Sequence, residues 1–180
     1  MNVIQLKDKK FELFIPEKDI QAAICRMAEQ IRKDTENHNP LFVGILNGAF
    51  MFIADLMHRL NGPYELTFAR YSSYHGTTTS GEIQEIMPIK SSIKGRSLIL
   101  LEDIIDTGLT MHYLKEKLNE EGAGEVKLAT MLFKPGALQY NDVTPDYVGL
   151  AIPNDFIVGY GLDYDELGRA YRDIYRLVED

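Results

Sequence analysis

Short apolar runs alternate along the chain with longer stretches in which apolar residues recur every three or four positions. Runs of this kind are typical of strands that are buried on both faces of a parallel sheet. Four of them lie at 41–46, 97–101, 125–133 and 145–151. The longer stretches predict amphipathic helices at 16–33, 50–60 and 107–121. This succession predicts an α/β fold in which a mostly parallel, twisted sheet is flanked by helices on both faces.

Weaker patterns predict the remaining strands. Residues 3–14 alternate weakly and are predicted to form an edge strand or arm, and 174–178 to form a final short strand. Residues 64–71 and 82–89 are predicted to be the two arms of a hairpin. The segment 72–81 between them is rich in Gly, Ser and Thr and too long for a tight turn, so its composition alone favours a disordered connector.

The composition favours one domain with a small-molecule partner. A chain of 180 residues can bury a full α/β core, and we expect a single domain spanning 1–180. Its 27 acidic and 19 basic residues give a net charge of −8, which argues against nucleic acid or an anionic membrane as the main partner. The one cysteine, Cys25, excludes a disulfide framework and fits a buried structural thiol. With no secretory signal pattern at the start, we expect a cytoplasmic protein.

The candidate chemistry lies between 97 and 114. Glu102 and Asp103 follow a buried run, and the segment 106–110 then turns the chain into a helix. Small hydroxyl residues and a glycine at a helix N-terminus leave backbone N–H groups aimed outward, which makes an anion site suited to phosphate. Carboxylates repel a phosphate, so the ligand should place neutral hydroxyls or a cation between the two groups. A ribose 5-phosphate meets both requirements.

Two simpler interpretations compete with this one. Receiver domains also gather aspartates at a strand end, but they lack the Asp-Thr-Gly-x-Thr segment found at 106–110. A second strand-turn-helix unit occurs at 41–60, where Gly48 allows close approach of the backbone. On that stretch alone, an ordinary connection between strand and helix explains the glycine as well as a ligand-binding loop does.

Residues 100–110 resemble the phosphoribosyl pyrophosphate signature of type I phosphoribosyltransferases, and Leu-Glu-Asp-Ile-Ile-Asp-Thr-Gly at 101–108 is close to the form found in the hypoxanthine-guanine branch of this family. The resemblance implies the family fold, with a small hood built from the chain ends. It implies transfer of a 5-phosphoribosyl group to hypoxanthine or guanine, with Mg²⁺ as cofactor. The implied partners are phosphoribosyl pyrophosphate and 6-oxopurine bases, and the implied assembly is a homodimer or homotetramer.

The resemblance assigns the acidic segment to the phosphoribosyl group. Glu102 and Asp103 would hold the ribose hydroxyls directly or through a metal ion, and Asp106 would be the catalytic base that takes or orients the purine N7 proton. Asp163 is implied as a further Mg²⁺ ligand beside Glu102 and Asp103. The implied phosphoribosyl-binding residues are Glu102, Asp103, Asp106, Thr107, Gly108, Leu109 and Thr110.

The segment Gly-Ile-Leu-Asn-Gly-Ala-Phe-Met-Phe is similar to the family's pyrophosphate loop, with Leu46, Asn47 and Gly48 as binding residues. Relatives often carry Lys or Arg at the position of Asn47, so here the loop would bind through backbone N–H groups and metal. The family commonly has a cis peptide bond at this place, which would join Leu46 to Asn47. Arg169 would meet the pyrophosphate, with Arg172 as the alternative.

The base site is implied by two further segments. Lys134 would donate to the purine 6-oxo group, Phe156 would stack on the ring, and Ile157 would pair with the base edge through its backbone. Asp163 is counted with these base-binding residues because it belongs to the same motif.

The resemblance also reinterprets the polar segment 72–81 as a mobile lid, whose Ser73 and Tyr74 would fold over the reaction centre and exclude water. Three alternatives to the hypoxanthine-guanine activity remain. One is a transferase that prefers xanthine. Another is a regulatory relative that binds RNA, which a net charge of −8 disfavours. The third is a non-catalytic nucleotide-binding module, which is disfavoured because both Asp106 and the lid segment are present.

Overall fold

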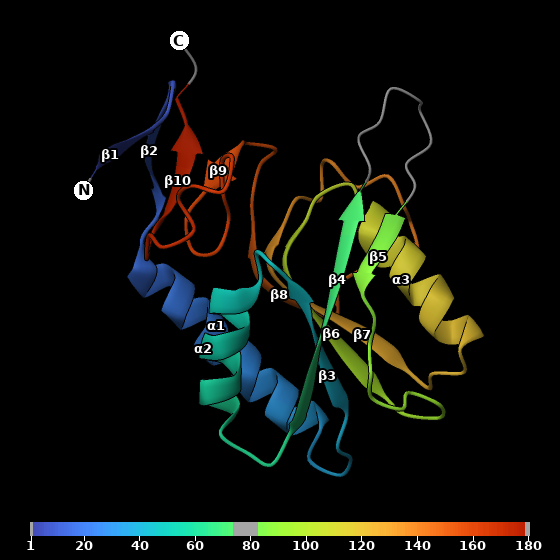
Figure 1. The fold of residues 1–180 in the computed structure, drawn as a ribbon. Helices are drawn as coiled ribbons and strands as arrows, with labels where there is room; N and C mark the ends of the chain where they lie inside the picture. The colour runs from blue at the N-terminus through green and yellow to red at the C-terminus, as the bar shows by residue number, and fades with distance from the viewer. Residues whose placement is uncertain (1, 74–82, 179–180) are drawn as a thin grey trace.

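A computed structural model describes residues 2–73 and 83–178, in which the strands form two separate sheets (Figure 1). The larger sheet has six strands in the order β5-β4-β3-β6-β7-β8, and only the β4–β5 pair is antiparallel. These strands are β5 (Ile83–Met87), β4 (Glu65–Ser73), β3 (Leu41–Leu46), β6 (Leu98–Ile105), β7 (Val126–Phe133) and β8 (Tyr147–Ala151). The predicted α/β fold with a mostly parallel sheet is confirmed.

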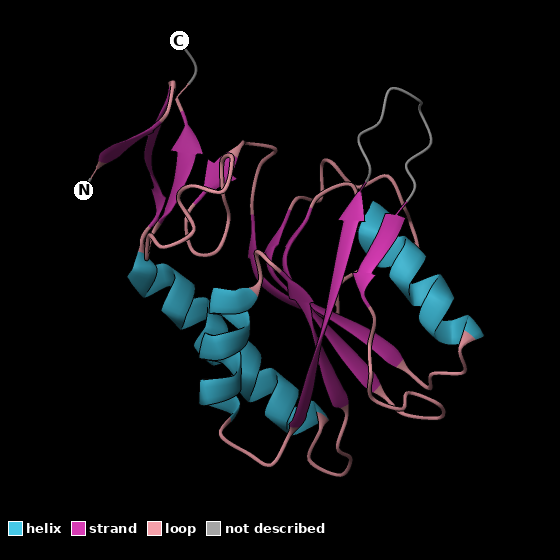
Figure 2. Ribbon diagram, viewed as in Figure 1, coloured by secondary structure: helices cyan, strands magenta, loops and turns pink. Residues whose placement is uncertain are grey.

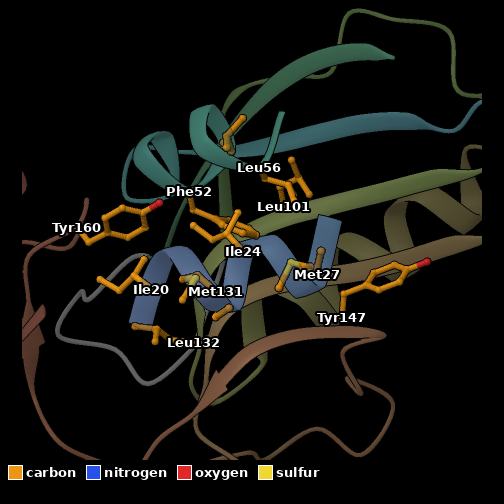
Figure 3. Close-up of a cluster of buried hydrophobic side chains, with 14 of the residues drawn as sticks. Ile20, Ile24, Met27, Phe52, Leu56, Leu101, Met131, Leu132, Tyr147 and Tyr160 are labelled. Carbon is orange, nitrogen blue, oxygen red and sulfur yellow. The ribbon is translucent and has the colours of Figure 1, made fainter. Parts of the chain in front are cut away.

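Helices cover both faces of the larger sheet (Figure 2). They are α1 (Glu17–Asp34), α2 (Phe50–Leu60) and α3 (Leu109–Glu120). The buried stripes of α1 and α2 pack together with one face of the sheet, in the cluster drawn in Figure 3. The stripe of α3, which contains Met111, Leu114 and Leu118, packs on the opposite face. None of the helices in the described part of the chain is long and apolar enough to cross a membrane.

The smaller sheet, which we call the hood sheet, joins the two ends of the chain. Its strands run antiparallel in the order β1 (Val3–Leu6), β2 (Lys9–Ile15), β10 (Ile174–Leu177) and β9 (Ile157–Val158). A small core of its own holds it together. Residues 3–14 were predicted to form one edge strand or arm. They instead belong to two strands, β1 and β2, of a hairpin that turns at Lys7, which has a φ of 51°. Strand β9 was not predicted.

The central strand is longer than predicted. Its hydrogen-bonded ladder with β7 continues past Leu101, pairing Glu102 with Thr130 and Ile105 with Phe133. The prediction that the strand ends before the acids was therefore wrong, because pairing to a long neighbour holds them in extended backbone. The next helix correspondingly begins at Leu109 rather than at Thr107.

Candidate active site

A cavity of about 230 Å³ lies at the carboxyl ends of β3 and β6. Its walls are residues 45–48, Glu102, residues 104–111 and Tyr71. In parallel α/β sheets ligands bind at this edge, because helix N-termini and loops converge there. The cavity therefore brings together the two glycine-containing segments that the sequence singled out.

The N-terminus of α3 forms one side of the cavity. Gly108 is the N-cap with a φ of 86°, and no side chain caps the helix. The turn is supported from behind, since Gln139 donates its backbone N–H to the Thr107 carbonyl at 2.9 Å, and a Cβ atom on Gly108 would lie 2.9 Å from Leu138. Thr107, Gly108, Leu109 and Thr110 all line the cavity. An uncapped helix start with a fixed glycine is suited to an anion.

The two acids lie side by side near the end of β6. The Asp103 backbone N–H donates to Glu102 Oε1 at 3.2 Å, and the Ile104 N–H donates to Asp103 Oδ1 at 2.8 Å. Burial raises the pKa of Glu102, and the neighbouring carboxylate of Asp103 raises it further. Burial raises the pKa of Asp103 as well. Two adjacent carboxylates of this kind are poorly compensated by the protein itself, so a cation beside them would favour their charged forms.

The donor set fits a hard cation that is shared with a ligand. No group of three or more His, Cys, Asp or Glu side chains in the described ranges is arranged to hold a metal ion. Magnesium commonly uses one or two carboxylates and takes its other oxygens from substrate phosphates and water. Glu102 and Asp103 supply that partial set.

The loop at 46–48 lies directly against one of the two acids, Asp103. A Cβ atom built on Gly48 would overlap Asp103 Oδ2, so the position admits only glycine while Asp103 keeps its place. Leu46, Asn47 and Gly48 all line the cavity. The peptide bond between Leu46 and Asn47 is cis, as the resemblance implied.

Lys134 and Asp106 meet beside the cavity, although they lie on different segments. Lys134 is only 7% exposed, and its Nζ lies 3.0 Å from Asp106 Oδ2. Its backbone N–H donates to the Ile105 carbonyl at 2.9 Å, which fixes the end of β7 against the end of β6. A buried ammonium is thus held beside the proposed base.

Arg169 lies near the acids, whereas Arg172 points to solvent. The Arg169 guanidinium contacts Asp163 Oδ1 at 2.8 Å and donates to the Gly161 carbonyl at 2.9 Å. It is close enough to Asp103 to lower the pKa of that carboxyl, opposing the effect of burial. The side chain of Arg172 is 79% exposed and lies 3.8 Å from Glu17. The geometry thus favours Arg169 over Arg172.

Phe156 and Ile157 belong to the hood sheet. Phe156 is 47% exposed and packs on the rings of Phe11 and Tyr164, with centroids 6.1 Å and 6.0 Å away. Ile157 is buried in β9, opposite Arg176. Neither residue lines the cavity at the end of β6, nor do Lys134, Asp163 and Arg169; of the predicted phosphoribosyl residues in the described part of the chain, Asp103 alone does not line it. The structure thus gathers the predicted phosphoribosyl residues more tightly than the predicted base-binding residues.

Strand β4 carries one predicted lid residue, Ser73, and one cavity residue that was not predicted, Tyr71. Ser73 is the last residue of β4, and Tyr74 lies outside the described residues. Tyr71 was missed: it lines the cavity, its hydroxyl donates to Glu85 Oε1 at 3.3 Å, and burial raises its pKa. The alternation at 64–71 shows that side chains point to two faces, but not which face meets a ligand.

The sequence of this chain is similar to those of known proteins. A family model described as "Phosphoribosyl transferase domain" matches residues 16–165. The hypoxanthine-guanine phosphoribosyltransferase of Lactococcus lactis is 43% identical over 161 residues, covering 88% of this chain and 87% of the relative. That of Streptococcus pyogenes serotype M3 is 40% identical over 156 residues, covering 86% of each.

Solved structures agree with the sequence comparison. A hypoxanthine-guanine phosphoribosyltransferase from Bacillus anthracis superposes with a TM-score of 0.87 at 35% identity, covering 93% of this chain and 98% of that one. A hypoxanthine phosphoribosyltransferase from Staphylococcus aureus gives a TM-score of 0.87 at 37% identity, covering 93% and 91%.

Proposed function

This chain belongs to the phosphoribosyltransferase family, and we propose that it transfers the 5-phosphoribosyl group of phosphoribosyl pyrophosphate to N9 of hypoxanthine or guanine. The C1′–oxygen bond to pyrophosphate breaks, the C1′–N9 bond forms, and the purine loses one proton. The products are IMP or GMP and pyrophosphate, the chemistry of purine salvage. The observation that carries this proposal is the single cavity in which an uncapped helix N-terminus faces the acid Glu102.

The phosphoribosyl group would lie across this cavity. Its 5-phosphate would accept hydrogen bonds from the backbone at 107–110, and its ribose hydroxyls would face Glu102, which lines the cavity, and Asp103, which lies against Gly48. The pyrophosphate would lie against Leu46, Asn47 and Gly48. Arg169 would supply the positive charge that the side chain of Asn47 lacks.

Asp106 would act at the base as the acceptor of the N7 proton, or as the group that orients it. Its partner Lys134 has three N–H donors, so one can remain on Asp106 at 3.0 Å while another meets the purine 6-oxo group. Adenine has an amino group at that position and cannot accept this hydrogen bond. The pair therefore supports a preference for 6-oxopurines.

We assign Mg²⁺ to Glu102, Asp103 and Asp163. When bound, the ion would neutralise charge on the pyrophosphate leaving group. The raised pKa values of Glu102 and Asp103 support this assignment, because burial is the largest effect on both acids and Arg169 offsets it only in part, at Asp103. Asp163 forms an ion pair with Arg169 at 2.8 Å. This pair would bring a carboxylate and a cation to the pyrophosphate end of the ligand.

The hood sheet would supply the remaining base contacts, with Phe156 stacking on the purine and the Ile157 backbone meeting its edge. Phe156 has an exposed face and two aromatic rings to support it. Ser73 and Tyr74 would cover the reaction centre, the role that the family resemblance gives them. The lone cysteine Cys25 supports a cytoplasmic location.

We also propose a homodimer or homotetramer. An apolar groove of about 420 Å³ lies between α2 and β4, and its walls include Phe50 and Phe68, which are 41% and 39% exposed. Exposed aromatic residues gathered in one groove are typical of an interface. Light scattering of the purified protein would give the assembly mass.

An initial-rate panel tests the proposed activity. The purified chain is given phosphoribosyl pyrophosphate and Mg²⁺ with hypoxanthine, guanine, xanthine or adenine in turn. We expect nucleotide from hypoxanthine and guanine, none from adenine, and no turnover in excess chelator. If xanthine is the preferred base, the protein is a xanthine phosphoribosyltransferase and the proposed specificity is wrong. If no base gives nucleotide, the proposed activity is wrong and the chain is a non-catalytic nucleotide-binding protein.

A further inference from the structure

One partly buried hydrogen bond ties the segment between β9 and β10 (159–173), which we call the hood segment, to the helices α1 and α2. The Tyr160 hydroxyl donates to Asp55 Oδ2 at 2.6 Å, and Gln21 Nε2 donates to the same carboxylate oxygen at 2.6 Å. Tyr160 follows β9, while Asp55 lies on α2 and Gln21 on α1. Tyr160 is only 4% exposed, and Figure 3 shows it at the edge of the cluster that contains Ile20 and Phe52. This side chain thus belongs to the core of the larger sheet, although its backbone belongs to the hood segment.

The backbone around Tyr160 is in an unusual conformation. Gly159, Tyr160 and Gly161 have φ values of 100°, 48° and 98°. A tyrosine in the left-handed region is uncommon and persists where the surroundings fix it. The hydrogen bond to Asp55 and the buried ring provide that constraint, and the Tyr160 N–H also donates to the Tyr171 carbonyl at 2.8 Å.

The constraint is transmitted to the proposed pyrophosphate site by close backbone packing. A Cβ atom on Gly161 would overlap the Gly48 carbonyl oxygen, and a Cβ atom on Gly48 would overlap Asp103 Oδ2. The residue after Tyr160 therefore lies directly against the loop at 46–48, and Gly48 of this loop lies directly against Asp103. A shift of Tyr160 would move each of these contacts in turn.

Gly161 also holds Arg169. Its carbonyl accepts from the Arg169 guanidinium at 2.9 Å, and its N–H donates to the Arg169 carbonyl at 3.0 Å. The same guanidinium contacts Asp163 at 2.8 Å. The positions of the cation and of Asp163 thus depend on where Gly161 sits, and Tyr160 fixes Gly161.

We propose that the Tyr160–Asp55 hydrogen bond positions Arg169 and Asp163 at the pyrophosphate end of the site, an inference that rests on the proposed function. Tyr160 touches no substrate atom in this role and acts through Gly161. Its loss should weaken pyrophosphate binding and leave the 5-phosphate cradle at 107–110 intact, because that cradle is supported by Leu138 and Val143 instead.

The chain offers a matched control for the variant Tyr160→Phe. Tyr147 is 1% exposed, and its hydroxyl donates to Asp34 Oδ2 at 3.0 Å. It lies at the start of β8, and the cavity lies at the carboxyl ends of the strands, the opposite edge of the sheet. Tyr147→Phe removes the same kind of hydrogen bond without touching the proposed route to Gly161.

Calorimetric titration with pyrophosphate in the presence of Mg²⁺ tests the proposal. Tyr160→Phe should raise the dissociation constant by up to about tenfold, because the full strength of one hydrogen bond to a charged group is the most that its loss can transmit to the ligand. Binding of ribose 5-phosphate should stay unchanged, and Tyr147→Phe should leave both titrations as in the wild type. Equal pyrophosphate affinities for wild type and Tyr160→Phe, or equal losses in the two tyrosine variants, would overturn the inference.

Two changes at the acceptor separate positioning from simple destabilisation. Asp55→Asn retains a carbonyl that can accept from Tyr160 and Gln21, so pyrophosphate affinity should be close to that of the wild type. Asp55→Ala should reproduce the loss seen in Tyr160→Phe, and the double variant should be no weaker than either single variant. Additive losses would contradict the inference.

The titration also separates this inference from the proposed function. If the wild type makes no nucleotide and Tyr160→Phe still loses pyrophosphate affinity, the positioning role stands and the transferase assignment fails. If the wild type makes IMP and the tyrosine variant binds pyrophosphate normally, the reverse holds.

Discussion

The carboxyl edge of the larger sheet (residues 46–48 and 102–110) and the hood sheet hold their functional residues in opposite ways. At the sheet edge, the acids and the proposed phosphate cradle come from one unbroken segment, which pairs with β7 as far as Ile105. At the hood sheet, Phe156 is held by strands from both ends of the chain: the Leu177 N–H of β10 donates to its carbonyl at 2.8 Å, and the ring of Phe11 in β2 packs on its ring. The first arrangement is local in sequence, and the second joins the two chain ends.

The difference extends to the forces involved. The sheet edge depends on buried packing and on overlaps that admit only glycine, as at Gly48. The hood carries exposed ion pairs such as Lys7–Asp165 and turns with positive φ at Asp165 and Glu166. Exposed pairs contribute little free energy. Substitutions at the sheet edge should therefore affect activity far more than substitutions on the outer surface of the hood.

The largest effect is expected from Gly48→Ala. The new methyl group would overlap the Asp103 carboxylate, so kcat/KM should fall by more than about 10²-fold, the cost of misplacing a reacting group by around an ångström. Steady-state kinetics with hypoxanthine would measure it. Gly136→Ala is the matched control, because its Cβ atom meets nothing within 4 Å. An active Gly48→Ala enzyme would mean that the acid can move freely.

Asp106→Asn should lower kcat by about 10²-fold, the usual range for losing a general base. The amide keeps the size of the side chain, and the phosphate cradle uses backbone N–H groups, so the KM for phosphoribosyl pyrophosphate should change little. The paired variant Glu102→Gln and Asp103→Asn should show the opposite pattern, a raised KM. An unchanged kcat with a raised KM in Asp106→Asn would make this residue a ribose ligand or structural cap.

Lys134→Gln should weaken the use of 6-oxopurines by about 1–3 kcal/mol in kcat/KM, since a buried charged donor is lost. Lys127→Gln is the control, because Lys127 lies near the start of β7, 3.8 Å from Glu125, whereas Lys134 directly follows the end of that strand. Guanine and hypoxanthine kinetics would measure both variants. Equal kinetics in the two would show that Lys134 does not meet the base.

The smallest effect is expected from Lys7→Ala in the hood. Its ion pair with Asp165 has side chains 48% and 59% exposed, so the free energy of unfolding should change by less than about 1 kcal/mol. Thermal unfolding should shift by no more than about 4 °C, and kinetics should be unchanged. A large loss of activity would show that the hood surface is as tightly coupled to the site as the sheet edge is.

The same contrast explains what the sequence could predict. Strand β3 and helix α2 have the predicted bounds, because strong apolar patterns and a glycine turn lie within one short segment. The end of β6 was missed, since its length depends on pairing with β7. Strand β9 and the Tyr160–Asp55 hydrogen bond were missed because each joins residues far apart in the chain. Features that depend on one short segment can be predicted from the sequence, whereas contacts between residues far apart in the chain cannot.

Phosphorus NMR of one reaction mixture would show whether the sheet edge and the hood sheet together transfer a phosphoribosyl group. The wild-type protein is mixed with phosphoribosyl pyrophosphate, Mg²⁺ and hypoxanthine, and the phosphorus signals are followed in time. We expect the signals of IMP and pyrophosphate to grow in equal amounts while the signals of phosphoribosyl pyrophosphate disappear. An unchanged donor, or ribose 5-phosphate and pyrophosphate without nucleotide, would contradict it.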